Sequence, residues 1–225
     1  MANVSEYGVR RFGRVNWLGV WTLIRRENMR YLAIWQQTIF APLITAGLFL
    51  LVFSIAIGPG RSDVMGFSYV VFLAPGLLMM TVIQNSFANT SSSMLSAKVM
   101  GSIVDTLMPP LSPVEMVIGF LAGGIGRGLM IGAVLVLAMW LTLEISVAHP
   151  IWTFVFVILG AMFMGALGLL GSIYAYKFDQ MAAISNFVIT PLAFLSGTFY
   201  SIKALPEMLQ PIIHANPMFY IIDGG

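Results

Sequence analysis

Residues 31–57 read YLAIWQQTIFAPLITAGLFLLVFSIAI, and no charged side chain lies between Arg30 and Arg61. A helix that crosses the roughly 30 Å hydrocarbon core of a bilayer needs about 20 consecutive, mostly apolar residues. This stretch meets that requirement. It predicts a membrane-spanning helix and therefore an all-α membrane protein.

The same pattern recurs along the chain, since residues 64–97, 128–143, 145–176 and 180–202 contain no Asp, Glu, Lys or Arg. Allowing for polar ends, we expect five spans, at about 31–57, 67–89, 115–142, 151–174 and 180–201. Hydrophobic residues make up 59% of the 225 residues and charged residues only 9%, against about 25% charged in soluble domains. This composition argues against a soluble globule. The scattered net charge of +2 argues against nucleic-acid binding, and the absence of cysteine excludes disulfides and thiolate metal sites.

The positions of the charges predict an orientation. The first 30 residues carry six arginines and no uninterrupted apolar stretch, so no cleavable signal peptide is expected. With Lys98 and Lys177, eight positive charges fall on one side of the predicted spans, against Arg61 and Lys203 on the other. The positive-inside rule then places the N-terminus in the cytoplasm, and Trp140 and Trp152 lie together at the opposite boundary, where aromatic residues are favoured.

Residues 14–30 precede the first span and have helical periodicity of their own. Trp17, Val20, Trp21 and Ile24 fall on one face, with most of the charges elsewhere. This pattern predicts an interfacial helix along the cytoplasmic leaflet. The alternative is that the segment is only the start of the first span.

The connection from Asn89 to Pro113 is the longest polar interruption. Apolar residues recur from Met94 to Leu107 at three- and four-residue steps, which predicts a short amphipathic helix outside the bilayer, ended by Pro109 and Pro110. Ser112-Pro113-Val114-Glu115 is a typical helix start with a capping box. The segment is either a packing loop or a docking surface for a cytoplasmic partner.

The third span contains six glycines, and Gly124, Gly128 and Gly132 form small-xxx-small steps that let another helix approach, within the subunit or between subunits. Arg127 lies well inside this span, where an unpaired arginine costs at least roughly 2.5 kcal/mol, so it should face the protein interior. It either bonds backbone carbonyls or a carboxylate such as Glu115, or it takes part in a translocation path.

After the fifth span, prolines and a Ser-Gly pair divide the chain into segments too short to cross a bilayer. Residues 203–222 therefore predict a re-entrant segment on the outer side. We expect its region to include Ser196, Gly197, Tyr200, Pro206 and Glu207.

These motifs resemble the permease subunits of ABC-2 type transporters, bacterial exporters of drugs, lipids and polysaccharides. The resemblance covers most of the chain and, within the family, is nearest to the YadH-like inner-membrane permeases. It is carried by three stretches: Pro109–Glu115, Phe178-Asp179-Gln180, and Pro191–Tyr200 with Leu205-Pro206 and Asn216–Tyr220.

The resemblance implies a single ABC-2 transmembrane domain over residues 1–225. It has an interfacial helix, six spans, a coupling helix in the first cytoplasmic loop, and outer re-entrant helices between spans five and six. The chain ends at Gly225, where a sixth span should begin. We therefore expect it to be truncated there.

The function implied by the resemblance is export across the bacterial inner membrane, powered by another subunit. The 225 residues contain no G-x-x-x-x-G-K-[ST] phosphate loop. We therefore expect no enzymatic activity and no bound cofactor, with ATP and Mg²⁺ held by a separate ATP-binding subunit. That subunit is expected to dock near Lys98, Met100, Gly101 and Asp105. A second permease subunit, identical or different, completes the assembly, and the sequence does not select its lipid, polysaccharide or drug-like cargo.

Three other classes fit less well. An ion-coupled secondary transporter, the alternative function, normally places acids or histidines inside its spans, but only Arg127 lies clearly within one here. An intramembrane hydrolase using Ser196 and His214 lacks the G-x-S-x-G elbow. A zinc enzyme lacks an H-E-x-x-H motif, and only two histidines are present.

Overall fold

The structure, a computed structural model, is all-α over the residues it describes, which are 13, 15–56, 69–143, 149–199 and 210–223. No strand occurs among them, which confirms the all-α part of the predicted fold class. The helices in chain order are α1 (Trp17–Leu32), α2 (Trp35–Ala56), α3 (Tyr69–Val99), α4 (Ile103–Leu107), α5 (Pro113–Leu143), α6 (Pro150–Tyr174), α7 (Phe178–Ile184), the π-helical η3 (Ser185–Ile189), α8 (Thr190–Phe194), α9 (Gln210–His214) and α10 (Pro217–Asp223).

Among the described residues, four helices are long and apolar enough to cross a membrane: Trp35–Phe53, Val71–Val99, Pro113–Thr142 and Pro150–Tyr174. They correspond to the first four predicted spans. In place of the fifth, α7, η3 and α8 form one continuous helical run, Phe178–Phe194. A rise of about 1.5 Å per residue makes this run about 25 Å long, short of the roughly 30 Å core. The fifth span therefore stays a prediction.

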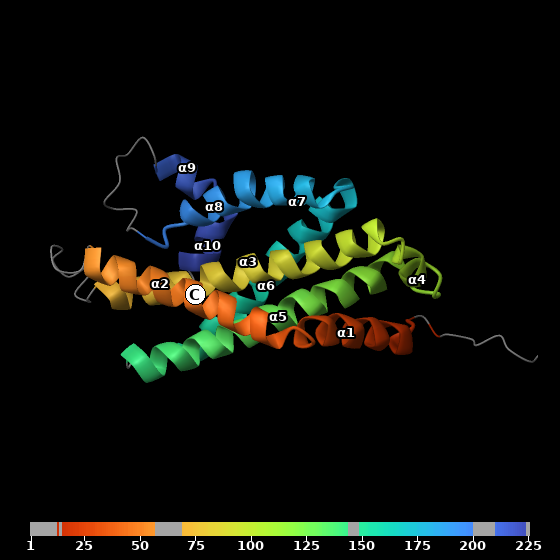
Figure 1. Cartoon of the computed structure of the whole chain (residues 1–225), viewed down its shortest axis with the longest axis horizontal. Helices are drawn as coiled ribbons and strands as arrows, with labels where there is room; N and C mark the ends of the chain where they lie inside the picture. Colours follow the sequence, from red (N-terminus) through yellow and green to blue (C-terminus); the bar gives the residue numbers. More distant parts are fainter. Residues whose placement is uncertain (1–12, 14, 57–68, 144–148, 200–209, 224–225) are drawn as a thin grey trace, which may run out of the picture.

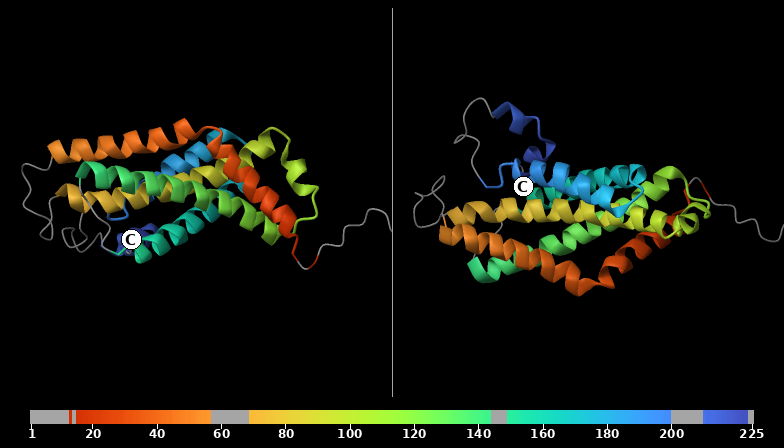
Figure 2. Two further views of the ribbon diagram at one scale, coloured as in Figure 1. Left: turned by 90° about the horizontal axis from the view of Figure 1, so that it is seen from below. Right: turned by 45° about the horizontal axis from the view of Figure 1, so that its top comes forward.

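The segment before the first span forms a helix of its own. The chain bends at Ala33 and Ile34, so α1 and α2 meet at an angle, which Figure 2 shows clearly. The contact of this apolar face with the leaflet stays a prediction. Val20 is buried, but Trp17 and Trp21 are 74% and 64% exposed. The buried face continues instead through Leu23, Glu27 and Tyr31, because this face packs on α5.

The prediction of an amphipathic helix beginning near Met94 is wrong. The helix α3 continues past Asn89 to Val99, and only the five-residue α4 is separate. The polar run that suggested a break is buried inside the bundle. Thr90 is fully buried, and its hydroxyl donates to the carbonyl of Gly165 on α6 at 2.8 Å. Ser91 and Ser92 donate to carbonyls one turn earlier in α3. These bonds keep the polar residues helical.

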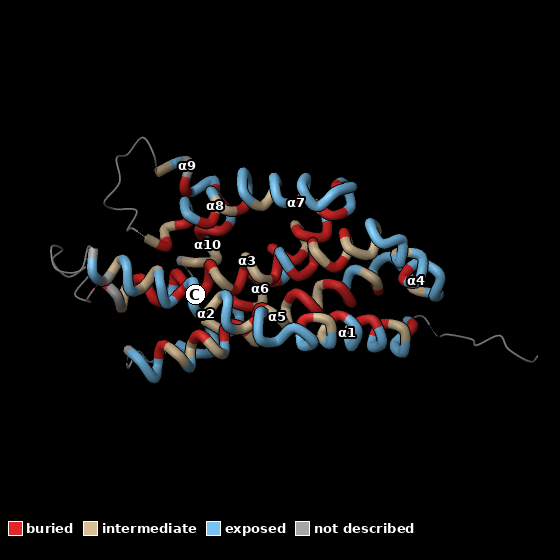
Figure 3. Tube along the Cα trace, in the orientation of Figure 1, coloured by how far each residue is buried: buried red, intermediate tan, exposed pale blue. Residues whose placement is uncertain are grey.

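The helix α3 is central, packed between α5 and α6, and Figure 3 shows much of it buried. The predicted small-residue stripe of α5 serves this contact within the subunit. A Cβ added to Gly124 would lie 2.8 Å from Thr90, and one added to Gly128 would lie 2.5 Å from Ser86. Glycine at these positions therefore allows α3 to approach closely.

Beyond α8 the chain turns and returns to the bundle. Gly197 has φ +86°, a left-handed conformation that favours glycine. The helix α10 packs against α3, α6 and α8, and Met218 is fully buried in the same apolar cluster as Ile83 and Met164. Asn216 ties this return to α8 by donating to the carbonyl of Leu192 at 2.7 Å. Residues 200–209 lie outside the described residues, so the re-entrant segment stays a prediction.

Candidate functional site

The helix α4 lies at one end of the bundle (Figure 1), and exposed apolar side chains surround it. We define the α4 tip by its five exposed apolar side chains, which lie at the end of α3, in the turn and on α4: Val99, Met100, Val104, Leu107 and Met108. Met100 and Met108 are 76% and 78% exposed. Gly101 makes the turn with φ +76°, a backbone conformation that L side chains rarely adopt. The α4 tip is therefore a small apolar surface whose shape depends on the turn at Gly101.

Three of the four residues expected to contact a partner lie at the α4 tip. Met100, Gly101 and Asp105 are exposed there. Lys98 is directed elsewhere: its Nζ donates to the carbonyls of Ser172, Ile173 and Ala175 at 2.7–2.9 Å. It therefore satisfies carbonyls at the end of α6, where a positive charge also complements the helix dipole.

The α4 tip is joined to α1 by side chains that the sequence analysis did not single out. Arg26 Nη1 donates to Thr106 Oγ1 of α4 at 2.9 Å. Asn16 Nδ2 donates to the carbonyl of Pro110 at 3.2 Å. Between these two links lies a groove of about 280 Å³, which Asp105 also lines. Displacement of α4 would therefore be transmitted to α1.

Glu115 joins the starts of α1 and α5. The predicted capping box is confirmed: Ser112 N donates to Glu115 Oε2 at 2.6 Å, and Glu115 N donates to Ser112 Oγ at 3.3 Å. The other carboxylate oxygen accepts from Asn16 N at 2.6 Å. One buried carboxylate thus holds the beginnings of both helices together.

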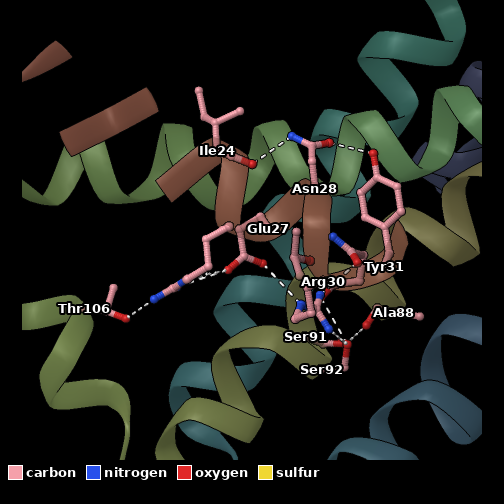
Figure 4. Close-up of polar contacts among 12 residues, drawn as sticks. Ile24, Glu27, Asn28, Arg30, Tyr31, Ala88, Ser91, Ser92 and Thr106 are labelled. Carbon is pink, nitrogen blue, oxygen red and sulfur yellow. Dashed lines mark hydrogen bonds and ion pairs between the residues drawn. The ribbon is translucent and has the colours of Figure 1, made fainter. Parts of the chain in front are cut away.

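A charged cluster centred on the buried Glu27 lies where α1 meets α3 and α5 (Figure 4). Glu27 is 1% exposed, and its Oε1 accepts from Arg26 at 3.1 and 3.3 Å. Its Oε2 lies 3.5 Å from Arg30 Nε. Arg30 in turn donates to both Asn89 oxygens at 2.8 Å and to Ser92 at 3.3 Å. Burial lowers the pKa of Arg30, and the Glu27 carboxylate opposes this change.

Glycines of α5 make this packing possible. A Cβ added to Gly123 would lie 2.5 Å from the Cβ of Glu27, and one added to Gly119 would meet Leu23. The helix α1 therefore runs along α5 in close contact. A signal for this role of Glu27 was available in the sequence, because it is the only acid within the arginine-rich stretch from Arg14 to Arg30.

Arg127 faces α3, as expected for an arginine that avoids lipid, but its partner differs from the carboxylate considered above. Arg127 Nη2 donates to Asn85 Oδ1 at 3.2 Å, whereas Glu115 binds the backbone of Asn16 and Ser112. Arg127 Nε is buried without a hydrogen-bond partner.

Of the residues expected in the re-entrant region, the structure describes Ser196 and Gly197, while Tyr200, Pro206 and Glu207 lie outside the described residues. Ser196 is fully buried; its hydroxyl donates to the Ala193 carbonyl and lies 3.1 Å from Thr198 Oγ1. These contacts fit a helix end rather than a nucleophile. Among the described residues, no group of three His, Asp or Glu side chains could hold a metal ion.

Comparison with known proteins extends over nearly the whole chain. Residues 19–225 match the ABC-2 type transporter family. The chain is 38% identical over 210 residues to the inner membrane transport permease YadH of Escherichia coli strain K12, covering 92% of this chain and 81% of that protein. It is 28% identical over 227 residues to nodulation protein J of Rhizobium leguminosarum bv. viciae, covering 94% and 81%. It is 24% identical over 215 residues to the protein of the same name from Sinorhizobium fredii strain NBRC 101917 / NGR234, covering 92% and 79%.

Proposed function

Because this chain belongs to the ABC-2 type transporter family, we propose that it is the membrane-spanning permease subunit of an ABC exporter of the bacterial inner membrane. ATP binding and hydrolysis are assigned to a separate subunit, and this chain forms the path for the cargo. The observation that carries the proposal is the α4 tip, an exposed apolar surface at one end of a bundle of long apolar helices.

The α4 tip suits a protein partner. Exposed apolar residues at the end of a membrane-protein bundle favour either lipid or another protein, and the exposed Asp105 beside them disfavours burial in lipid. Met100 and Met108 have flexible, polarizable side chains that adapt to a partner's surface. We therefore propose that the ATP-binding subunit docks on the α4 tip, with Met100, Gly101 and Asp105 at the contact. Lys98 would support the tip through its hydrogen bonds to the end of α6.

The contacts between helices supply a route for the motion. Closure of the ATP-binding subunits would displace α4, and the Arg26–Thr106 and Asn16–Pro110 bonds would carry that displacement to α1. Glu115 would carry it to the start of α5. A rigid movement of these helices is a recognised way to open and close a transport path.

The proposal includes an arrangement in the membrane. The N-terminus and the α4 tip face the cytoplasm, in line with the positive-inside rule. Trp140 and Trp152, at the other end of the bundle, are 58% and 64% exposed, as residues at the outer interface should be. We propose that the fifth span covers about residues 180–201, of which the helical run Phe178–Phe194 forms the larger part, and that residues 203–222 re-enter from the outside.

The assembly contains two permease subunits, identical or different, with the cargo path between them. The cargo is a lipid, a polysaccharide or a drug-like amphiphile. The permease YadH and the nodulation proteins J are similar along the same length, and their names identify no common cargo.

The test measures ATP hydrolysis by the complex of this chain with its co-purified ATP-binding subunit. Met100→Asp should lower hydrolysis several-fold because it places a charge in an apolar contact. Met100→Leu, the matched control, should preserve hydrolysis, and both variants should reach the membrane in normal amount. Unchanged hydrolysis in Met100→Asp and in Gly101→Pro would refute the docking site. Transport that persists without ATP under a proton gradient would instead favour the secondary transporter.

A further inference from the structure

Arg127 has a positive charge that no acid in the described part of the chain neutralises. Both ion pairs among the described residues use the same carboxylate, that of Glu27, whose partners are Arg26 and Arg30. Arg127 has only the neutral amide of Asn85, at 3.2 Å. One of the five N–H groups of its guanidinium is bonded, and the others make no hydrogen bond within the described residues.

The groups around Arg127 add positive charge and do not neutralise its own. The neighbouring Gly126 lies against the end of α1, since a Cβ added there would be 2.9 Å from the Tyr31 hydroxyl. Arg30, which precedes Tyr31, donates to Asn89 of α3, one helical turn from the Asn85 that binds Arg127. The next cation along α1, Arg30, has a side chain that is 35% exposed. The junction of α1, α3 and α5 therefore contains more positive than negative charge.

Water can satisfy the free N–H groups, but it cannot neutralise the charge. A charge held away from bulk water is stable when a counter-charge accompanies it. Arg127 is half-buried, so a ligand can reach the side chain. Because Nε itself is buried, the ligand would meet the Nη edge of the guanidinium. Planar guanidinium groups match the oxygen spacing of phosphate and bind it through paired hydrogen bonds.

We propose that Arg127, with the positive charge of Arg30 beside it, binds a phosphate group at the junction of α1, α3 and α5. The phosphate belongs either to the headgroup of a membrane lipid or to a soluble phosphate. This inference goes beyond the proposed function, which assigns no role to Arg127.

Native mass spectrometry of the purified chain in detergent tests the proposal. Phosphatidylglycerol is titrated in, and inorganic phosphate is added in a separate arm. Wild type should hold one phosphatidylglycerol per chain, and Arg127→Gln should weaken this binding at least tenfold. The control is Arg25→Gln, which removes an exposed arginine from the same region of α1 and should change binding less than twofold. Displacement of the lipid by inorganic phosphate at millimolar concentration would identify a soluble phosphate as the ligand, and retention of the lipid would identify the headgroup.

A second variant keeps the test decisive if Arg127→Gln folds poorly. Asn85→Asp has nearly the same shape and places a carboxylate about 3 Å from Arg127, which supplies the missing counter-charge internally. It should preserve or raise the melting temperature and still weaken phosphatidylglycerol binding at least tenfold. Unchanged lipid binding in Asn85→Asp, or equal losses in Arg127→Gln and Arg25→Gln, would overturn the proposal. The measurement needs no ATP-binding subunit, so its failure would leave the proposed transport function untouched.

Discussion

Replacing Glu27 by Gln should loosen α1 from the bundle. Glu27 is 1% exposed and pairs with both arginines that bond α1 to its neighbouring helices. It orients Arg26, which donates to Thr106 of α4, and it pairs with Arg30, which donates to Asn89 of α3. Glutamine keeps the shape and one acceptor oxygen but removes the charge that both arginines share.

The size of the effect follows from these contacts. Breaking a fully buried ion pair costs about 3–5 kcal/mol, but the Arg26 and Arg30 side chains are 44% and 35% exposed and are partly screened. Glutamine also retains one neutral hydrogen bond, worth about 1 kcal/mol. We therefore expect the free energy of opening α1 to fall by about 2–3 kcal/mol, which is a loss of protection of roughly 30- to 150-fold.

Hydrogen exchange of the detergent-purified protein measures this opening directly. Amides of α1 from Val20 to Tyr31 should exchange faster in Glu27→Gln, while those in the middle of α6 should not change. Asp179→Asn, which neutralises an exposed acid on α7, is the control and should leave α1 as in wild type. A change below about 0.5 kcal/mol in α1, or one shared equally by α6, would refute the role assigned to Glu27.

Other contacts give predictions for thermal unfolding of the protein in detergent. Lys98→Met should destabilise it by about 2 kcal/mol, because three carbonyls at the end of α6 lose a charged donor; an unchanged melting temperature would contradict this. Gly123→Ala should cost about 1–3 kcal/mol, since its Cβ would lie 2.5 Å from α1, whereas Gly47→Ala, with nothing within 4 Å, should be neutral or stabilising; equal effects would be inconsistent with close α1–α5 packing. Gly168→Ala should also lower the melting temperature, because its Cβ would meet the Thr90 hydroxyl and a backbone carbonyl of α3 that cannot rotate away. A wild-type melting temperature would exclude that contact.

Sequence motifs correctly predicted those features of the fold whose contacts join residues close together in the chain. The capping box at Ser112 and Glu115 gave the start of α5 correctly, because its bonds connect residues three apart in the chain. The second contact of Glu115 was not predictable in this way. It joins Asn16 to a residue far along the chain, and no sequence period encodes that distance.

Polar residues were the main source of error. The hydroxyl run after Asn89 predicts an end of the span, yet Thr90 is buried and bonded to α6. Polarity alone cannot distinguish solvent from a partner helix. Arg127 shows the same limit: its cost in lipid predicted an inward orientation, but the choice of Asn85 as its partner depends on how α3 and α5 pack. The glycine stripe beside it was correctly predicted as a close helix contact, and the structure shows that the contact lies within the subunit.

The central claim is that the α4 tip receives an ATP-binding subunit, and site-specific crosslinking in the membrane tests it most directly. The chain contains no cysteine, so Met100→Cys provides a single site for a photo-crosslinker. Ile151→Cys, an exposed position (77%) at the start of α6, is the control at the other end of the bundle. The account predicts that Met100→Cys captures a protein whose sequence contains G-x-x-x-x-G-K-[ST], identified by mass spectrometry, and that Ile151→Cys does not. Capture of that protein equally from both sites, or from neither, would contradict the account.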